Sequence, residues 1–375
     1  MKVLIIQHYL NFNLHKRNPT NVFPKLLIKA ITDAGMTYEV CSFTKKEILA
    51  SIGRGCKFIL NFEEASTQNA IKFMGGSTKA ADEMSMSAGS KNAIDKMFET
   101  LFDIEKLVPI YPPVAVLQLT KSKTYLDVLP NKTTLFMPST KTFLYYKTTV
   151  ADLFQHTLGY FKRKKISEII IKFGYSGDSE HVFKYSIDPD ITDHAKAELF
   201  EAMSHYSHKC GRPFLVIVQP FNSVISNRLN EYRCLFTGGV MSPVAAFGFS
   251  LSPTNNRIFI PSLELDPENI EHAEIIALAK YGYEKMSKYV GFNLPVLRVD
   301  VSWVIHEGVK RYYINEFEGL SGTYYFNIPY LPKDSGPYRI TDIYECTPAT
   351  CKNYPIEVPR RLARSLVDYI KLALD

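Results

Sequence analysis

Two strand-like runs on either side of a polar turn constrain the fold of this 375-residue chain more than any other part of its sequence. The first run is residues 297–303, the second is residues 312–317, and Gly308 lies in the turn between them. Runs rich in β-branched and aromatic residues that flank a glycine-containing turn predict a β-hairpin. We therefore expect paired strands over residues 294–301 and 311–317.

Charged residues recur at alternate positions along both runs. Because side chains alternate faces along a strand, Arg298 and Asp300 share one face of the first strand, and Glu316 and Glu318 share one face of the second. Pairing of the strands would bring three carboxylates together, where like charges repel strongly unless a cation neutralises them. Mg²⁺ binds oxygen ligands of this kind. The hairpin is a candidate magnesium site, and the alternative is a solvated hairpin with ordinary surface charge.

Length and composition predict a soluble protein with several domains. A chain of 375 residues exceeds one compact core, so we expect about two or three domains. Six scattered cysteines form no Cys-x-x-Cys pair, which argues against zinc. The apolar run at the N-terminus is too short for a signal peptide, and no stretch of about 18 apolar residues suggests a membrane span. We expect a cytoplasmic protein in a reducing compartment.

The net charge of +6 is mild, and the strongest basic run is residues 162–165. The favoured interpretation of this run is the solvated end of a helix, and the alternative is a contact with an anionic partner. A nucleic-acid-binding protein would usually show a wider basic stripe and a recognisable module, and neither is seen here.

The first part of the chain alternates between strand and helix patterns. Residues 2–6, 38–43 and 56–60 are strand-like, and helices are expected from Pro24 and over residues 91–101. This alternation predicts an open α/β domain with parallel strands. A cluster of prolines, Pro109, Pro112 and Pro113, marks the expected domain boundary.

The remainder of the chain mixes further helices and strands. A short helix is expected over residues 121–129, ending before Pro130. Other expected helices are residues 150–161, 195–208, 267–289 and 360–374, and expected strands are residues 169–172, 214–219 and 231–236. The strand at 169–172 ends in Lys172 and runs into a Gly/Ser-rich loop. Such a loop can bind phosphate through its backbone N–H groups, or it can be an ordinary hairpin turn, and the sequence favours neither.

At this point the order of elements resembles the ATP-grasp superfamily, over roughly residues 115–325. The resemblance rests on a front α/β domain, a lysine, a lysine-terminated strand with a Gly/Ser loop, an apolar strand ending in Gln, and the motifs Glu-Tyr-Arg, Arg-x-Asp and Glu-x-Glu. It implies an α/β plus α+β architecture, with domains at 1–114 (front α/β), 115–219 (lid, with Lys172) and 220–375 (metal carboxylates). Members of this superfamily clasp Mg·ATP, so the implied cofactors are ATP and two magnesium ions.

The resemblance also implies roles for residues around the nucleotide. Lys121 and Lys172 resemble the two ATP-binding lysines, although Phe173 replaces the usual proline after the second. The phosphate-covering loop corresponds to Gly174, Ser176, Gly177 and Ser179. Gln219 and Phe221 resemble the adenine-contacting segment, although Pro220 stands where the family has Glu.

The implied catalytic and metal residues lie later in the chain. Glu231 and Arg233 resemble a strand of amino-acid ligases, in which the arginine would hold substrate or γ-phosphate. The implied metal ligands are Asp300, Glu316 and Glu318, and Gly322 resembles the glycine after them. Arg298 is a further catalytic candidate, and the alternative is that it orients Asp300.

Three functions are compatible with these residues. The first is an ATP-dependent ligase that joins a carboxylate to an amine through an acyl phosphate, with a small-molecule or peptide acceptor. The second is a small-molecule kinase for an anionic polyol, in which residues 162–165 and Arg360, Arg361 and Arg364 would face the acceptor. The third is a non-catalytic binding or structural protein, suggested by the departures at Phe173 and Pro220. The sequence favours the ligase and leaves the oligomeric state open.

Overall fold

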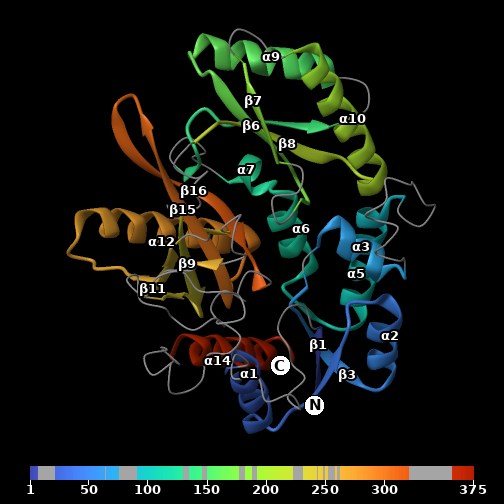
Figure 1. Cartoon of the computed structure of the whole chain (residues 1–375). Helices are drawn as coiled ribbons and strands as arrows, with labels where there is room; N and C mark the ends of the chain where they lie inside the picture. The colour runs from blue at the N-terminus through green and yellow to red at the C-terminus, as the bar shows by residue number, and fades with distance from the viewer. Residues whose placement is uncertain are drawn as a thin grey trace.

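A computed structural model describes residues 1–6, 22–63, 65–75, 91–129, 135–145, 150–176, 182–187, 192–222, 231–242, 244–247, 250–251, 258–259, 262–320 and 357–375. Three sheets of four or more strands follow one another along the chain, each covered by helices (Figure 1). No helix in these ranges is both long enough and apolar enough to cross a membrane.

The N-terminal sheet is parallel, as predicted. Its strands have the order β2-β1-β3-β4, and their bounds are β1 Lys2–Ile6, β2 Thr37–Cys41, β3 Cys56–Asn61 and β4 Ile110–Tyr111. Helices accompany these strands: α1 Val22–Asp33, α2 Lys45–Gly53, α3 Thr67–Phe73 and α5 Ala93–Leu107. Strand residues such as Leu4 and Ile59 are fully buried, which explains their continuous apolar sequence.

The second sheet is antiparallel, with the order β5-β8-β6-β7. Its strands are β5 Lys141–Tyr145, β6 Glu168–Phe173, β7 Val182–Ser186 and β8 Phe214–Pro220. Helices α9 Val150–Arg163 and α10 Asp193–Cys210 lie beside it, close to the predicted ranges. Pro138 precedes the edge strand β5, a position that proline tolerates because it needs no backbone N–H there.

The third sheet has the order β14-β11-β9-β15-β16, with β10 paired to β9. Its strands are β9 Tyr232–Thr237, β10 Val240–Met241, β11 Val244–Phe247, β14 Ser262–Glu264, β15 Val296–His306 and β16 Val309–Glu318, and β12 Ser250–Leu251 pairs separately with β13 Ile258–Phe259. Helix α12 Ile270–Val290 packs on this sheet. It approaches β16 so closely at Gly282 that an added Cβ would lie 2.4 Å from the Ile314 side chain.

One helix differs from its prediction. In place of a single helix over residues 121–129, α6 Val114–Ser122 ends first, and a short α7 Tyr125–Val128 follows. Lys123 separates them in the left-handed conformation, with φ +58°. The backbone of Tyr175 explains this end point, because its N–H donates to the Lys121 carbonyl in the last turn of α6.

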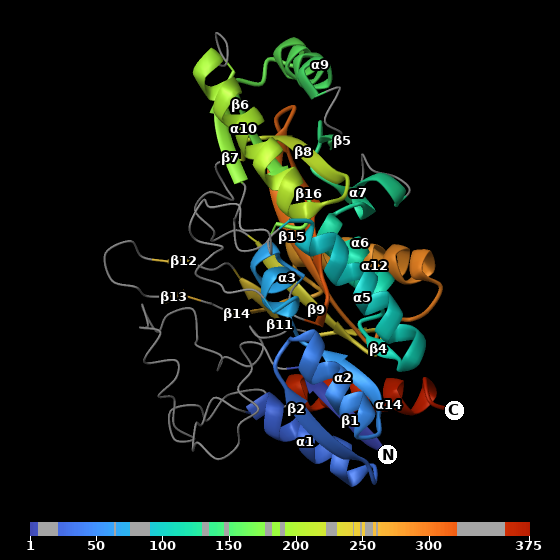
Figure 2. The ribbon, with the colours of Figure 1, turned by 90° about the vertical axis from the view of Figure 1, so that its right-hand side faces the viewer.

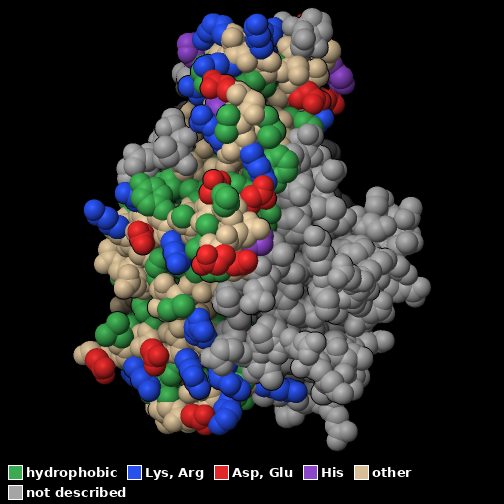
Figure 3. Space-filling view, turned by 90° about the vertical axis from the view of Figure 1, so that its left-hand side faces the viewer, with side chains coloured by type: hydrophobic (Ala, Val, Ile, Leu, Met, Phe, Trp, Pro, Cys, Tyr) green, Lys and Arg blue, Asp and Glu red, His purple; other side chains and the backbone are tan. Residues whose placement is uncertain are grey.

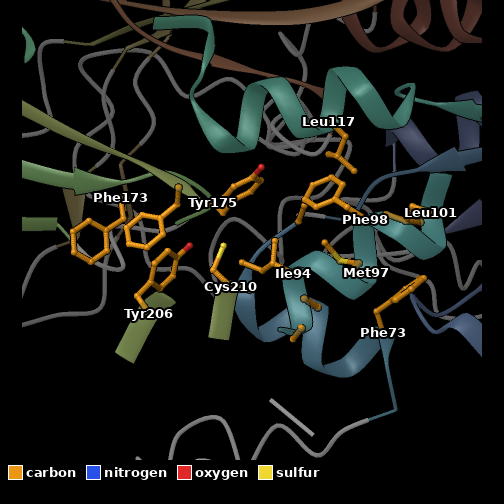
Figure 4. Packing of buried hydrophobic residues seen from close by; sticks show 14 of the residues in the cluster. Phe73, Ile94, Met97, Phe98, Leu101, Leu117, Phe173, Tyr175, Tyr206 and Cys210 are labelled. Carbon is orange, nitrogen blue, oxygen red and sulfur yellow. The ribbon is translucent and has the colours of Figure 1, made fainter. Parts of the chain in front are cut away.

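The sheets share hydrophobic cores across long sequence distances. Helix α14 Glu357–Leu372 packs against α1, so the two ends of the chain lie together (Figure 2). The Tyr111 hydroxyl at the end of β4 donates to the Val296 carbonyl over 3.1 Å. Phe173 of β6 and Tyr206 of α10 share a core with Phe98 of α5 (Figure 4). These contacts fix the three units around the residues described next.

Candidate nucleotide and metal site

A polar face of the third sheet gathers most of the predicted site residues. In the ladder, Asp300 on β15 lies opposite Glu316 on β16 and Arg233 on β9, while Arg298 lies opposite Glu318. Opposed residues of neighbouring strands project to the same face. The predicted hairpin is confirmed, and its three carboxylates project from one face of the sheet.

A β-bulge adds a polar side chain that the sequence analysis did not anticipate. The β15–β16 register shifts after Asp300, so that Asn315 has no partner of its own in the ladder. The Asn315 Nδ2 donates to Glu231 Oε1 over 2.6 Å, which joins β16 to the start of β9. Its Oδ1 is buried and accepts no hydrogen bond within the described part of the chain.

Two lysines face the carboxylates from the end of α6. The Lys121 ammonium donates to Glu318 over 2.9 Å, and Lys123 Nζ lies 2.8 Å from Glu316 Oε1. The four side chains are between 8% and 25% exposed, so the pairs are largely withdrawn from solvent. Ion pairs in such surroundings interact more strongly than surface pairs.

Two arginines complete a set of four ion pairs. Arg298 makes a two-pronged contact with Asp300, with Nε–Oδ1 and Nη2–Oδ2 distances of 2.8 and 2.7 Å. Arg233 Nη2 lies 3.2 Å from Glu231 Oε2. Each acidic side chain of the polar face therefore has its own cation. In keeping with this, the described residues contain no group of three His, Cys, Asp or Glu side chains placed to hold a metal ion in this conformation.

Lys172 is the exception to this pairing, because within the described ranges it makes no ion pair. It lies at the end of β6 and is half-buried. Burial, reinforced by the nearby Lys123, lowers the pKa of the Lys172 ammonium to about 8. Burial opposes ionisation of Glu316, but Lys123, Lys121 and Lys172 outweigh it and hold the pKa of that carboxyl at about 2. For Asp300, burial raises the pKa and the Arg298 guanidinium opposes the increase.

The backbone after Lys172 is held against the helix that carries the other two lysines. A Cβ on Gly174 would lie 2.5 Å from the Ser122 carbonyl oxygen, so glycine is required for this close approach. The Tyr206 hydroxyl donates to the Gly174 carbonyl over 2.8 Å, and the Tyr175 N–H donates to Lys121. The segment that follows Lys172 and the C-terminal end of α6 thus pack directly against each other.

The remaining predicted nucleotide residues are placed as follows. The hydroxyl of Ser176 donates to the Phe173 carbonyl within the same turn. Gln219 is buried and donates to Thr140 Oγ1 over 3.2 Å. The Phe221 ring lies 3.6 Å from the Lys184 ammonium. Residues predicted for the loop and the following motif, Gly177, Ser179 and Gly322, lie outside the described residues.

The sequence analysis missed Lys123, Asn315 and Tyr175. A Lys-x-Lys pattern was visible, but residues two apart on a helix do not share a face. Lys123 joins Lys121 at the site because α6 ends between them.

Comparisons with known proteins give a consistent fold. No family model and no curated protein matches the sequence. Among solved structures, the D-cycloserine synthetase DcsG is similar, with 14% sequence identity, a TM-score of 0.57, and coverage of 98% of this chain and 99% of that one. A RimK domain ATP-grasp protein from Sphaerobacter thermophilus has 12% identity, a TM-score of 0.50, and coverage of 98% and 99%. The chain has the ATP-grasp fold.

Proposed function

We propose that this protein is an ATP- and magnesium-dependent ligase that joins a carboxylate to an amine through an acyl phosphate. The observation that carries the proposal is the polar face of β9, β15 and β16, with Lys121, Lys123 and Lys172 facing its carboxylates. Phosphoryl transfer depends chiefly on positioning and on neutralisation of charge. This arrangement supplies carboxylates that can bind a metal ion and lysines that can bind phosphate.

The donor set suits magnesium. Asp300, Glu316 and Glu318 offer hard carboxylate oxygens, and Asn315, at the bulge before Glu316, has a buried Oδ1 that accepts no hydrogen bond within the described residues. These carboxylates would hold the ions, which when bound would neutralise phosphate charge.

Four of the cationic residues have a proposed role in this scheme. Lys121 and Lys172 bind the phosphates, and Arg233 holds the γ-phosphate or the carboxylate substrate. We assign Arg298 an orienting role, because two of its guanidinium nitrogens, Nε and Nη2, engage the two carboxylate oxygens of Asp300. We retain the proposed division into residues 1–114, 115–219 and 220–375.

The proposed reaction has two steps. A substrate carboxylate oxygen attacks the γ-phosphorus, and the bond to the β-phosphate oxygen breaks to release ADP. The amine nitrogen then attacks the acyl carbon, loses a proton, and expels inorganic phosphate. The likeness to a synthetase and to a RimK domain protein supports this class, and we propose an amino-acid or peptide-type substrate.

The kinase alternative relied on two cationic groups, and the fold separates them. Residues 162–165 span the C-terminal end of α9, whereas Arg360, Arg361 and Arg364 belong to α14. These helices lie at opposite ends of the molecule (Figure 1), and Figure 3 shows Lys and Arg side chains at both ends. The two groups therefore do not line one small-molecule site.

Incubation with Mg·ATP and mixed amino acids tests the proposal. A ligase releases ADP and inorganic phosphate in equal amounts, and only when both substrates are present. A kinase releases ADP without phosphate. Absence of amino-acid-dependent ADP formation across a broad substrate panel, or equal activity in the Asp300→Asn variant, would contradict the ligase assignment.

A further inference from the structure

The end of α6 presents two lysines to two neighbouring acidic residues of β16. Lys121 pairs with Glu318 and Lys123 pairs with Glu316, at 2.9 and 2.8 Å. The pairs repeat each other: the lysines are two residues apart, and so are the glutamates. Each glutamate is one of the residues proposed above to hold magnesium.

The lysines are placed by the fold rather than by flexible surface chains. Lys121 is in the last turn of α6, whose carbonyl accepts from Tyr175 N–H. Lys123 follows in the left-handed conformation and is 14% exposed. The pairs are thus a built feature of the junction between α6 and β16.

Removing either partner of such a pair is costly. A divalent ion that enters without nucleotide must displace a lysine from its carboxylate in a partly dry site. Nucleotide that enters without the ion must draw the lysines away from Glu316 and Glu318. When both enter together, each lysine exchanges a carboxylate for phosphate and each carboxylate exchanges a lysine for the ion, so no charge is left uncompensated.

We propose that Lys121 and Lys123 are placeholder cations, which occupy the metal carboxylates of the nucleotide-free protein and make binding of divalent ion and nucleotide mutually dependent. This inference rests on the proposed function. It gives Lys123, which has no role in the scheme above, the function of keeping Glu316 occupied until nucleotide arrives. Lys172, which makes no ion pair within the described residues, is the charge available to attract the incoming phosphates.

Mn²⁺ binding, followed by the electron paramagnetic resonance signal of the free ion, tests the proposal on the full-length protein. Without nucleotide, wild type should bind Mn²⁺ weakly, and Lys123→Gln should bind it about tenfold more tightly, because a competing positive charge has been removed. Lys123→Arg keeps the charge and should behave as wild type. Lys106→Gln is the matched control, since it removes an equal charge from an exposed pair with Asp103 on α5.

With a non-hydrolysable ATP analogue, Mn²⁺ should bind wild type much more tightly, and Lys123→Gln should show a smaller gain. Lys123→Met, which keeps the aliphatic stem, replaces the glutamine variant if that variant does not fold. Equal Mn²⁺ affinity of wild type and both neutral variants without nucleotide overturns the placeholder role, even where the analogue binds. Failure of wild type to bind the analogue with Mn²⁺ overturns the proposed function itself, and the inference with it.

Discussion

The two hairpins that meet at the site differ in whether their charged side chains form ion pairs. The β15–β16 hairpin carries Asp300, Glu316 and Glu318, and every one of these carboxylates has a cation at 2.7 to 2.9 Å. The β6–β7 hairpin carries Lys172, whose ammonium makes no ion pair among the described residues and whose pKa is lowered to about 8, first of all by burial. The carboxylates of the β15–β16 hairpin are therefore paired with cations before a ligand binds. The Lys172 ammonium of the β6–β7 hairpin is available to pair with an anionic ligand.

From this comparison we expect the largest loss of stability when an ion pair of the β15–β16 hairpin is broken. Asp300→Ala leaves the Arg298 guanidinium buried without its carboxylate, and loss of one partner of a buried pair costs about 3–5 kcal/mol. We expect that decrease in the free energy of unfolding, measured by urea titration, together with loss of ADP formation.

A double variant separates the two effects of Asp300. Replacement of both partners, Arg298→Met with Asp300→Leu, removes the uncompensated charge, so stability should return toward the wild-type value. ADP formation should remain absent, since the proposed metal carboxylate is still missing. Recovery of activity in the double variant would show that Asp300 serves only the fold.

Lys172 should show the reverse behaviour. Lys172→Met should abolish most ATP-dependent activity while raising the free energy of unfolding by about 1–2 kcal/mol at pH 7, because burial of an unpaired ammonium no longer opposes folding. A variant that lost activity and stability together would contradict the contrast between the hairpins.

The pH dependence of stability follows from the same group. The folded-state pKa, about 8, lies below the usual lysine value of 10.5, so the unfolded chain binds more protons between these values. The wild type should therefore gain stability relative to Lys172→Met as pH rises from 8 to 10.5. Parallel urea titrations at pH 7, 9 and 10 measure this difference, which a constant offset between the two proteins would refute.

Gly174→Ala tests the contact that links the two hairpins through α6. The added Cβ would lie 2.5 Å from the Ser122 carbonyl oxygen, so the strand carrying Lys172 must move. We expect activity to fall about 10- to 100-fold, since small displacements in a phosphoryl-transfer site are costly. Gly53→Ala is the control, because its Cβ meets nothing within 4 Å and it ends a helix of the N-terminal unit.

Much of this architecture could be predicted from local periodicity in the sequence. The β15–β16 hairpin, the parallel N-terminal strands and helices such as α10 and α12 could be predicted, because each has its own periodicity. The end of α6 at Ser122 could not, since it depends on the backbone of Tyr175, which lies in the turn after β6. Because the end of α6 was not predicted, Lys123 was not included in the predicted site.

The bulge at Asn315 could not be predicted for a related reason. Strict alternation along β16 correctly placed Glu316 and Glu318 on one face, but it gives no signal for an extra residue in the ladder. The packing of α14 on α1, which brings the two ends of the chain together, could not be predicted either. An amphipathic pattern shows that a helix has a buried face, but it does not show which element covers that face.

Asn315→Ala should have the smallest effect and sharpens the account of the β15–β16 hairpin. It removes the 2.6 Å hydrogen bond to Glu231, whose carboxylate still has Arg233, so the unfolding free energy should fall by only about 1 kcal/mol. If the unpartnered Oδ1 also lies against the bound ion, Mn²⁺ affinity in the presence of the ATP analogue should fall several-fold in this variant. Asn315→Asp keeps that oxygen and should retain Mn²⁺ binding although it loses the hydrogen bond to Glu231. An equal loss of Mn²⁺ affinity in both variants would instead mean that Asn315 acts through Glu231 and the start of β9.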